Sequence, residues 1–215
     1  MKNLPVNVLL FIFSISLNAL GNSFMIIADL GSAPWTAAGQ NLETVLPFSV
    51  GVCIILLNLF SFILSRLMKV QFTLGLVIKS LALAFAFGLS IDLFMYLHHK
   101  IYVPENIWVR GLYLLIGINL VALALCIYFQ ASDVYLPPDY LLKAFGERMN
   151  NYSIGNIVFM SIPISISLVI MLFHRHVTGL GIGTVLCMFG MGLLLDFYNR
   201  RIVIQQAPKP KTYSA

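Results

Sequence analysis

Three ionisable side chains lie inside long apolar stretches of the sequence, namely Lys79, Asp92 and Asp196. If these stretches cross a bilayer, a charge at its centre costs at least about 2.5 kcal/mol, which makes such residues candidates for a function. Lys79 could pair with a carboxylate or bind an anionic substrate, and its alternative role is to extend to the headgroups. Asp92 and Asp196 could carry a coupling proton. Alternatively each serves as a helix cap or in an ion pair, because Arg200 follows Asp196 by one helical turn.

Polar and turn-forming residues concentrate directly after the first apolar stretch, in Asp-Leu-Gly-Ser-Ala-Pro-Trp-Thr at positions 29–36. Gly31 allows the chain to turn, Ser32 can cap a new helix, and Pro34 suits the first helical turn. We therefore predict a short helix over residues 34–45, which the next proline ends.

A second short helix is predicted over residues 138–149, opened by Pro137-Pro138-Asp139. The first N–H groups of such helices have no partner within the helix and carry partial positive charge. If the two helix starts turn inward, they offer anion sites along a substrate path, as broken helices do in transporters. The alternative is a pair of amphipathic connectors that lie flat on the membrane surface.

Asparagines within the apolar stretches could line a polar path or bond neighbouring helices, and interhelical bonding is the commoner use. They are Asn18, Asn22, Asn58 and Asn119. The full set of candidate residues for a substrate or ion path is Asn18, Asn22, Asp29, Ser32, Pro34, Trp35, Thr36, Lys79, Asp92, Asp133, Asp139 and Asp196.

No residue pattern in the chain predicts catalysis, a metal site or a cofactor. The sequence has no Ser/His/Asp arrangement, no His-Glu-x-x-His motif and no phosphate loop. Adjacent and alternate histidines in two loops are weak evidence for a metal; they are His98, His99, His174 and His176. The spacing of Cys53, Cys126 and Cys187 fits neither a zinc site nor a disulfide framework, so we expect apolar packing for them and no enzymatic activity.

The composition identifies lipid as the solvent of the chain and the bilayer as its main partner. Hydrophobic residues make up 60% of the 215 residues, charged residues 10%, and the mean hydropathy is +0.92. A soluble domain carries roughly 25% charged residues. The positions of the Lys and Arg residues relative to the membrane account for the formal net charge of +5, so nucleic acid is not an expected partner.

Six apolar stretches are long enough to cross a hydrocarbon core of roughly 30 Å as helices. We place them at residues 5–27, 48–66, 74–97, 108–130, 152–173 and 178–198. None alternates with period two as a barrel strand would, so the predicted fold class is all-α and polytopic. The first stretch follows Lys2 but contains Asn18 and Asn22 and lacks a clean cleavage site, so we expect it to be retained.

The distribution of Lys and Arg predicts that both termini lie in the cytoplasm. Nine of these residues then fall on the inner side and three on the outer side, as the positive-inside rule requires. The inner ones are Lys2, Arg66, Lys69, Lys143, Arg148, Arg200, Arg201, Lys209 and Lys211, and the outer ones are Lys100, Arg110 and Arg175.

An internal repeat is visible when the sequence is shifted by 104 residues without a gap. Residues of rare types then coincide: Asp29 with Asp133, Pro34 with Pro138, Glu43 with Glu147, Ser49 with Ser153, Gly51 with Gly155, Gly75 with Gly179, Gly88 with Gly192, and Asp92 with Asp196. Each copy has three spans, an odd number, so the second enters the membrane inverted, as in many secondary transporters. If the stretch after the first span of each copy also crossed, the copies would be parallel instead; the charge distribution favours three spans.

We therefore divide the chain into a first three-span repeat at 1–99, a second at 100–202 and a disordered basic cytoplasmic tail at 203–215. The glycines of the sixth span predict a face for close helix packing. They are Gly179, Gly181, Gly183, Gly190 and Gly192.

The motif Leu30-Gly31-Ser32-Ala33-Pro34-Trp35-Thr36, followed by Phe48-Ser49-Val50-Gly51, resembles that of the YczE/YyaS group of bacterial integral membrane proteins, which are loosely grouped with YitT-type proteins. That group has a similar Gly-x-x-Pro-Trp-Asp pattern, so Thr36 departs from it at the acidic position, and Asp139 replaces the tryptophan in the second copy. The resemblance implies a protein of the bacterial cytoplasmic membrane and adds little about its chemistry.

Two functions fit these observations. The first is a small secondary transporter that moves a small molecule or ion between the inverted repeats. The second is a non-transporting protein that assists or positions another membrane protein, or a further copy of itself. A channel is a weaker alternative, because the chain lacks an evident selectivity-filter segment.

Overall fold

The structure is a computed structural model that describes residues 4–149, 152–175 and 178–204. The remaining residues lie outside this description, and with them Lys2, His176, Lys209, Lys211 and most of the predicted tail.

The described chain is all-α, as predicted. Its eight helices are α1 (Leu4–Ala28), α2 (Pro34–Glu43), α3 (Val50–Leu67), α4 (Leu74–Ile101), α5 (Ile107–Ala131), α6 (Pro137–Arg148), α7 (Tyr152–His174) and α8 (Ile182–Asn199). Six of them, all but α2 and α6, are long and apolar enough to cross a membrane. This confirms six candidate spans, although α8 begins four residues later than predicted, because Thr178–Gly181 form a loop.

The two short helices cannot cross a bilayer. With 10 residues in α2 and 12 in α6, a rise of 1.5 Å per residue gives lengths of roughly 15 and 18 Å, against roughly 30 Å of hydrocarbon. Each half of the sequence therefore holds three spans, and the alternative of a fourth span in each half has no structural basis.

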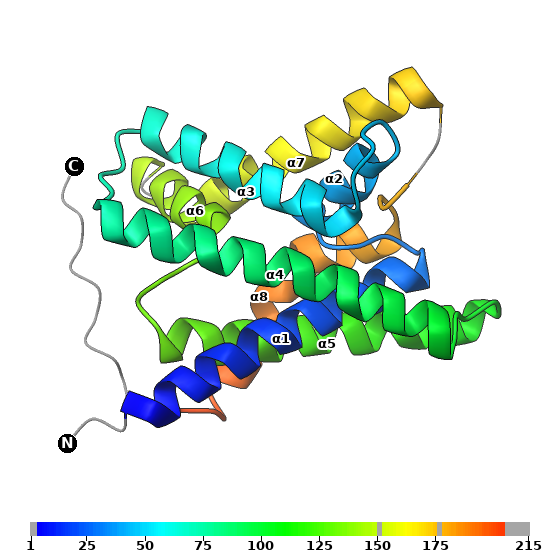
Figure 1. Ribbon diagram of the computed structural model, residues 1–215, viewed down its shortest axis with the longest axis horizontal. Coiled ribbons are helices and arrows are strands. Elements are labelled where there is room, and N and C mark those ends of the chain that lie inside the picture. Colours follow the sequence, from blue (N-terminus) through cyan, green and yellow to red (C-terminus); the bar gives the residue numbers. More distant parts are fainter. Residues whose placement is uncertain (1–3, 150–151, 176–177, 205–215) are drawn as a thin grey trace.

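The helices form two layers (Figure 1). One layer contains α1 and α5, which pack together extensively, with α4 on the outer side of α1 and α8 on the outer side of α5. The other layer contains α3, α2, α6 and α7, in which α2 and α6 each pack against both α3 and α7. The two layers meet closely along α3 and α4, whereas α7 and α8 make no comparable contact.

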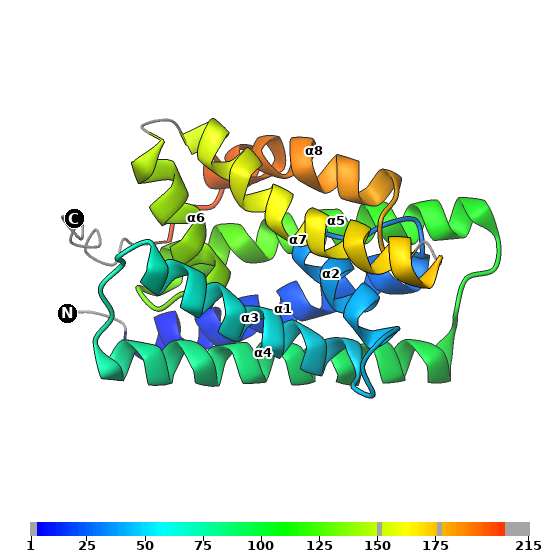
Figure 2. The ribbon, with the colours of Figure 1, turned by 90° about the horizontal axis from the view of Figure 1, so that it is seen from above.

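The two short helices lie at opposite ends of the molecule. Helix α1 begins and α8 ends at the same end, on the left in Figures 1 and 2, which we call the terminal end. Helix α6 lies towards this terminal end, and α2 lies towards the other, which we call the distal end.

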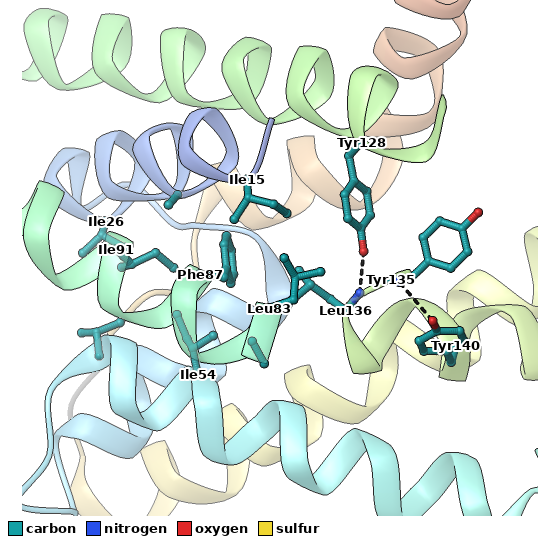
Figure 3. Packing of buried hydrophobic residues seen from close by; sticks show 13 residues of the cluster. Ile15, Ile26, Ile54, Leu83, Phe87, Ile91, Tyr128, Tyr135, Leu136 and Tyr140 are labelled. Atoms are coloured by element: carbon teal, nitrogen blue, oxygen red, sulfur yellow. Dashed lines mark hydrogen bonds between the residues drawn. The ribbon is translucent and has the colours of Figure 1, made fainter. Parts of the chain in front are cut away.

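The main apolar core lies between the two layers (Figure 3). Its centre is formed by Ile15, Ile54, Leu83, Phe87 and Ile91, which come from α1, α3 and α4. A second cluster joins α1, α5 and α8 and includes Met25, Ile118 and Cys187. All three cysteines are buried and free, as their apolar surroundings in the sequence predicted.

Helices α1 and α5 cross at two glycines. A Cβ atom at Gly21 would lie 2.8 Å from the carbonyl oxygen of Gly117, and one at Gly117 would lie 2.7 Å from that of Gly21. No side chain fits at either position without separating the backbones, so these glycines set the distance between the two central helices.

We predict that Gly117→Val destabilises the protein, because its side chain would push α1 away from α5. Overpacking of this kind typically costs about 1–3 kcal/mol. Gly111→Val in the same helix is the matched control, because a Cβ there has nothing within 4 Å. Thermal unfolding in detergent should show a lower Tm for Gly117→Val only, and equal values for the two variants would contradict this packing.

Candidate functional site

Helix α2 is buried in the protein from its first turn. Pro34 and the residues from Thr36 to Asn41 are buried, whereas Glu43 and Thr44 at its other end are exposed. The helix therefore inserts with its N-terminus inwards, against α3 and α7. This excludes the alternative of a connector lying flat on the surface. The helix also ends at Glu43, ahead of the predicted proline stop.

A buried hydrogen-bonded network ties the first turn of α2 to α1. The Thr36 hydroxyl donates to Asn22 Oδ1 over 2.6 Å, and Asn22 Nδ2 donates to Asn18 Oδ1 over 2.8 Å. All three residues are at least 95% buried. The structure thus brings together three predicted site residues, in the middle of apolar surroundings where such groups need partners.

Ser32 has a different role from the predicted helix cap. The residue before α2 is Ala33, and no side chain caps the helix. The Ser32 hydroxyl instead donates to Gln40 Oε1 over 2.6 Å, and both residues are buried. This bond joins the loop before α2, which we call the entry loop, to a side chain about two turns into the helix.

The entry loop of α2 is closed by the loop before α8. The Ser32 N–H donates to the carbonyl oxygen of Gly179, and the Gly183 N–H donates to that of Leu30, both over 2.9 Å. Gly31 has φ +99°, and a Cβ at Gly183 would lie 2.0 Å from the carbonyl oxygen of Gly31. Glycine is therefore required on both sides of this contact.

Of the five glycines predicted to form a packing face, three pack closely against other backbone and two do not. Gly179, Gly181 and Gly183 contact α2 or its entry loop. Gly190 and Gly192, by contrast, have nothing within 4 Å of a Cβ placed on them. The close-packed surface therefore ends at the first turn of α8.

The first turn of α6 carries the corresponding site of the second half. The Tyr128 hydroxyl donates to Asp139 Oδ2 over 2.8 Å and accepts a hydrogen bond from the N–H of Leu136. The Leu136 contact is one of the dashed lines in Figure 3, together with the bond from the Tyr135 N–H to the Tyr140 hydroxyl. A tyrosine of α5 thus fixes both the start of α6 and its carboxyl group.

Burial raises the pKa of the Asp139 carboxyl to about 6. The hydrogen bond from Tyr128 and the charge of Lys143, one turn further along α6, oppose this rise. Burial also lowers the pKa of Lys143, whose ammonium group lies 3.8 Å from the centre of the Tyr135 ring. Asp139 is consequently a carboxyl group that can change protonation near neutral pH.

Asp92 is the N-terminal partner of α3. Its carboxylate accepts a hydrogen bond of 2.6 Å from the Ser49 hydroxyl and one of 2.8 Å from the Gly51 N–H. A carboxylate is favourable there because a helix N-terminus carries partial positive charge. The pKa of nearby Glu43 is raised, first by the partial desolvation of its carboxyl group and then by the charge of Asp92, although much of its side chain is exposed. The helix cap that was one of the predicted roles of Asp92 is therefore present.

Several predicted site residues lie away from both buried sites. Asp29 is exposed and pairs with Arg110 over 2.8 Å, the single salt bridge within the described residues. Arg110 also donates to the carbonyl oxygens of Ala28 and Asp29, so it closes the C-terminus of α1. Asp133 and Lys79 are exposed.

Asp196 is also exposed, and the described structure contains no ion pair between it and Arg200, contrary to the predicted pairing. Trp35 packs against Phe159 of α7, with ring centres 5.2 Å apart. Its indole Nε1 is buried and has no hydrogen-bond partner among the described residues, and the same holds for Asn58 Oδ1.

Residues of the sites that the sequence did not single out are Gln40, Asn41 and Tyr128. Asn41 Nδ2 donates to the carbonyl oxygen of Thr178 and so joins α2 to the second half of the chain. The unusual polarity of a short helix between apolar spans was a signal for Gln40 and Asn41. Tyr128 had none, because a tyrosine near a span end is expected to anchor at the interface.

We predict a pH-dependent stability difference between the wild type and Asp139→Asn. A pKa raised from 3.8 to about 6 means that the folded state holds the proton more tightly, so stability is greatest below about pH 4 and falls as the pH rises through 6. The asparagine variant lacks this loss. The Tm of the wild type, measured from pH 4 to 7.5, should fall relative to that of Asp139→Asn, and parallel curves would refute the assignment.

A second prediction concerns the network at α2. Thr36→Val keeps the shape of the side chain but leaves Asn22 Oδ1 without its donor, which we expect to cost about 1–2 kcal/mol. Thr36→Ser should largely restore the wild-type Tm in detergent. Thr44→Val is the control on the exposed end of the same segment, and a loss there as large as at Thr36 would argue against a special role of the network.

Comparisons with known proteins relate the chain to a family of unknown function. An uncharacterized protein of Haemophilus influenzae (strain KW20/Rd) is 25% identical over 189 residues, which cover 88% of this chain and 81% of that protein. No solved structure matches the chain. The model of a family of unknown function, DUF6198, matches residues 6–200, which include both buried sites and all six candidate spans, and the chain therefore belongs to this family.

Proposed function

We propose that this protein is a small secondary transporter of the bacterial cytoplasmic membrane, in which a solute moves between two inverted repeats. The observation that carries the proposal is the placement of α2 and α6. Each is too short to span, begins inside the protein and is tied by a side-chain hydrogen bond to the preceding long helix. Half-helices whose N-termini point into the protein near opposite surfaces are a common basis of substrate sites in transporters.

The pattern of helix packing supports the inverted repeat. A shift of 104 residues relates α1 to α5, α2 to α6, α3 to α7 and α4 to α8. Under this shift the pair α1/α4 corresponds to α5/α8, α2/α3 to α6/α7, and α3/α6 to α7/α2, and all of these pairs pack. Helix α1 packs on its own counterpart α5, as expected for two helices beside a pseudo-two-fold axis.

The charge distribution supports a cytoplasmic terminal end. The ends of α3, α6 and α8 lie towards this end in Figure 1, whereas the ends of α4 and α7 and the start of α5 lie towards the distal end. In or directly after the first group of helix ends the sequence has Arg66, Lys69, Arg148, Arg200 and Arg201, and at the second group it has Lys100, Arg110 and Arg175. With the positive-inside rule, α6 then faces the cytoplasm and α2 the outside.

Buried polar groups between the layers are the proposed substrate path. The network of Asn18, Asn22 and Thr36 lies on the distal side, and Asp139 with Tyr128 on the terminal side. In the layer of α2, α3, α6 and α7, Trp35 Nε1 and Asn58 Oδ1 have no hydrogen-bond partner among the described residues and are available to bond a solute or water. Asp29 and Lys79 face outwards and have no part in this path.

The motif around Pro34 and Trp35 additionally supports a relationship to the YczE/YyaS group, and the absence of a catalytic pattern supports a non-enzymatic role without a cofactor. The expected partners are the bilayer and a small molecule or ion.

Uptake into proteoliposomes tests the proposal. We expect protein-dependent flux of at least one solute from a broad panel of radiolabelled or fluorescent compounds, driven by an imposed pH gradient. Asp139→Asn should abolish the coupling to the gradient, because the carboxyl with a pKa of about 6 is removed. Glu105→Gln, in the exposed loop between α4 and α5, is the matched control and should retain flux. Absence of any flux with correctly folded protein would remove the transporter proposal.

A second function is favoured by the outer face of α7 and α8. Large apolar side chains such as Leu172, Phe189 and Leu193 are exposed there, and Gly190, next to Phe189, leaves room for a closely packed helix because a Cβ on it has nothing within 4 Å. A membrane protein partner or a second copy would fit this face. Stoichiometric copurification of one defined membrane protein, lost in Gly190→Leu, would support this function over transport.

A further inference from the structure

One hydrogen-bond donor and one acceptor are buried near the short helices without a partner in the described part of the chain. The donor is the indole Nε1 of Trp35, in the first turn of α2, and the acceptor is Oδ1 of Asn58 in α3. Asn58 is only 3% exposed and is the ninth of the 18 residues of α3, so it lies in the middle of a span. Polar groups at this depth need partners, because the surrounding hydrocarbon offers none. A ligand from outside the chain would satisfy both atoms.

Asn58 lies on α3 between the two short helices. One turn before it, Ile54 contacts α2, because a Cβ placed on Gly39 would lie 2.6 Å from Ile54 Cγ1. One turn after it, Phe62 stacks on Tyr140 in the first turn of α6, with ring centres 6.4 Å apart. Positions 54, 58 and 62 lie on the same side of α3, so Asn58 faces the junction between α2 and α6.

Trp35 lies at the same junction, on the side of α7. Its indole packs on Phe159, with ring centres 5.2 Å apart. One turn earlier on α7, a Cβ at Gly155 would lie 2.6 Å from the backbone of Gly146 in α6. Helix α7 therefore contacts α2 and α6 at successive turns, as α3 does. Figure 2 shows α6 and α2 one after the other between α3 and α7.

The polar groups at this junction favour an uncharged ligand. Trp35 Nε1 can only donate, so it does not favour a cation. The amide nitrogen of Asn58 is already bonded to the carbonyl oxygen of Ile54, and the remaining Oδ1 can only accept, so it does not favour an anion. The carboxyl group of Asp139, in the first turn of α6, is engaged by Tyr128 of α5. The best match is therefore a ligand without net charge that carries both an acceptor and a donor.

We propose that the substrate of this protein is a small uncharged amide or polyol, which accepts a hydrogen bond from Trp35 Nε1 and donates one to Asn58 Oδ1 at the junction of α2 and α6. This inference rests on the proposed transport function and names its substrate class. The first turn of α2 has no side-chain cap, so its N–H groups also favour a carbonyl or hydroxyl oxygen. Phe159, beside the donor, provides an apolar surface for the carbon atoms of such a solute.

The fluorescence of Trp35 measures binding directly, because a hydrogen bond to the indole N–H shifts the emission to longer wavelength. The other of the two tryptophans, Trp108, is exposed, so Trp108→Phe leaves Trp35 as the single reporter. This protein, in nanodiscs, is titrated with urea, acetamide and glycerol. Acetate and acetamidinium are the matched charged probes, because they share the shape of acetamide. Trp35→Phe, which keeps only Trp108, measures the effect of the solutes on an indole outside the site.

We expect a saturable shift to longer wavelength with at least one of the three uncharged solutes, and none with acetate or acetamidinium. Loss of one hydrogen bond in Asn58→Leu should weaken binding about tenfold. The Tm of this variant without solute should equal or exceed that of the wild type, because an unpaired buried oxygen is removed. Asn119→Leu, at an exposed asparagine of α5, is the matched control and should bind as the wild type does.

Three results overturn the site: no shift with any uncharged solute, an equal shift with acetate or acetamidinium, or binding that Asn58→Leu leaves unchanged. A Tm of Asn58→Leu well below that of the wild type does so too, because Asn58 Oδ1 would then already have a partner. Failure of transport is a separate result. Binding without uptake into proteoliposomes upholds the site and refutes the transporter, whereas uptake of a solute that leaves the emission of Trp35 unchanged upholds transport and refutes the site.

Discussion

The need to satisfy buried backbone and side-chain polar groups without water governs this structure. In a bilayer every unpaired N–H or C=O group costs several kcal/mol. A helix can therefore begin or end inside the hydrocarbon region only where other protein groups form hydrogen bonds with its end. Helices α2 and α6 both begin in the interior, and the first turn of each is hydrogen-bonded to a polar side chain of the preceding long helix. This side chain is Asn22 for α2 and Tyr128 for α6. The loops before them are in turn held by backbone hydrogen bonds to the opposite half or by buried hydroxyls, such as that from Ser80 to Tyr135.

The two halves satisfy this constraint with different residues. The position of Thr36 in the first half is occupied by Tyr140 in the second, and that of Asn22 by Cys126. The first half therefore uses neutral amides and hydroxyls, whereas the second uses a carboxyl group bonded to a tyrosine hydroxyl, with a lysine over the ring of a second tyrosine. A common backbone arrangement is thus compatible with two chemically distinct interiors, one of which titrates near neutral pH and the other of which does not contain an acid.

The sequence predicts the fold better than it predicts the sites, for physical reasons. Apolar runs of this length indicate spans, and a proline after a polar turn indicates the start of a short helix, so the helix positions follow closely from Pro34 and Pro137. Burial of these short helices does not follow, because their composition is equally compatible with the membrane surface. The partners of Asp92 and the exposure of Lys79 depend on how the helices rotate about their axes, and that rotation is set by contacts such as Gly21 on Gly117 between distant segments. Ser49 and Gly51 recur with Asp92 in the repeat, and this joint recurrence was the one sequence signal of their contact.

The contact between the loop before α2 and the loop before α8 also fixes the order in which the molecule is completed. Asn41 bonds to Thr178, 137 residues later in the chain, and Leu30 accepts its hydrogen bond from Gly183. During synthesis the first three spans enter the membrane well before residues 178–183 have been made, so α2 spends that time without its cover. Biogenesis therefore passes through a stage in which the polar groups of α2 face lipid, water or the insertion machinery, and the last helical hairpin seals the first half of the protein. A chain truncated before α8 would lack this seal and is expected to be a substrate for quality-control proteolysis in the membrane.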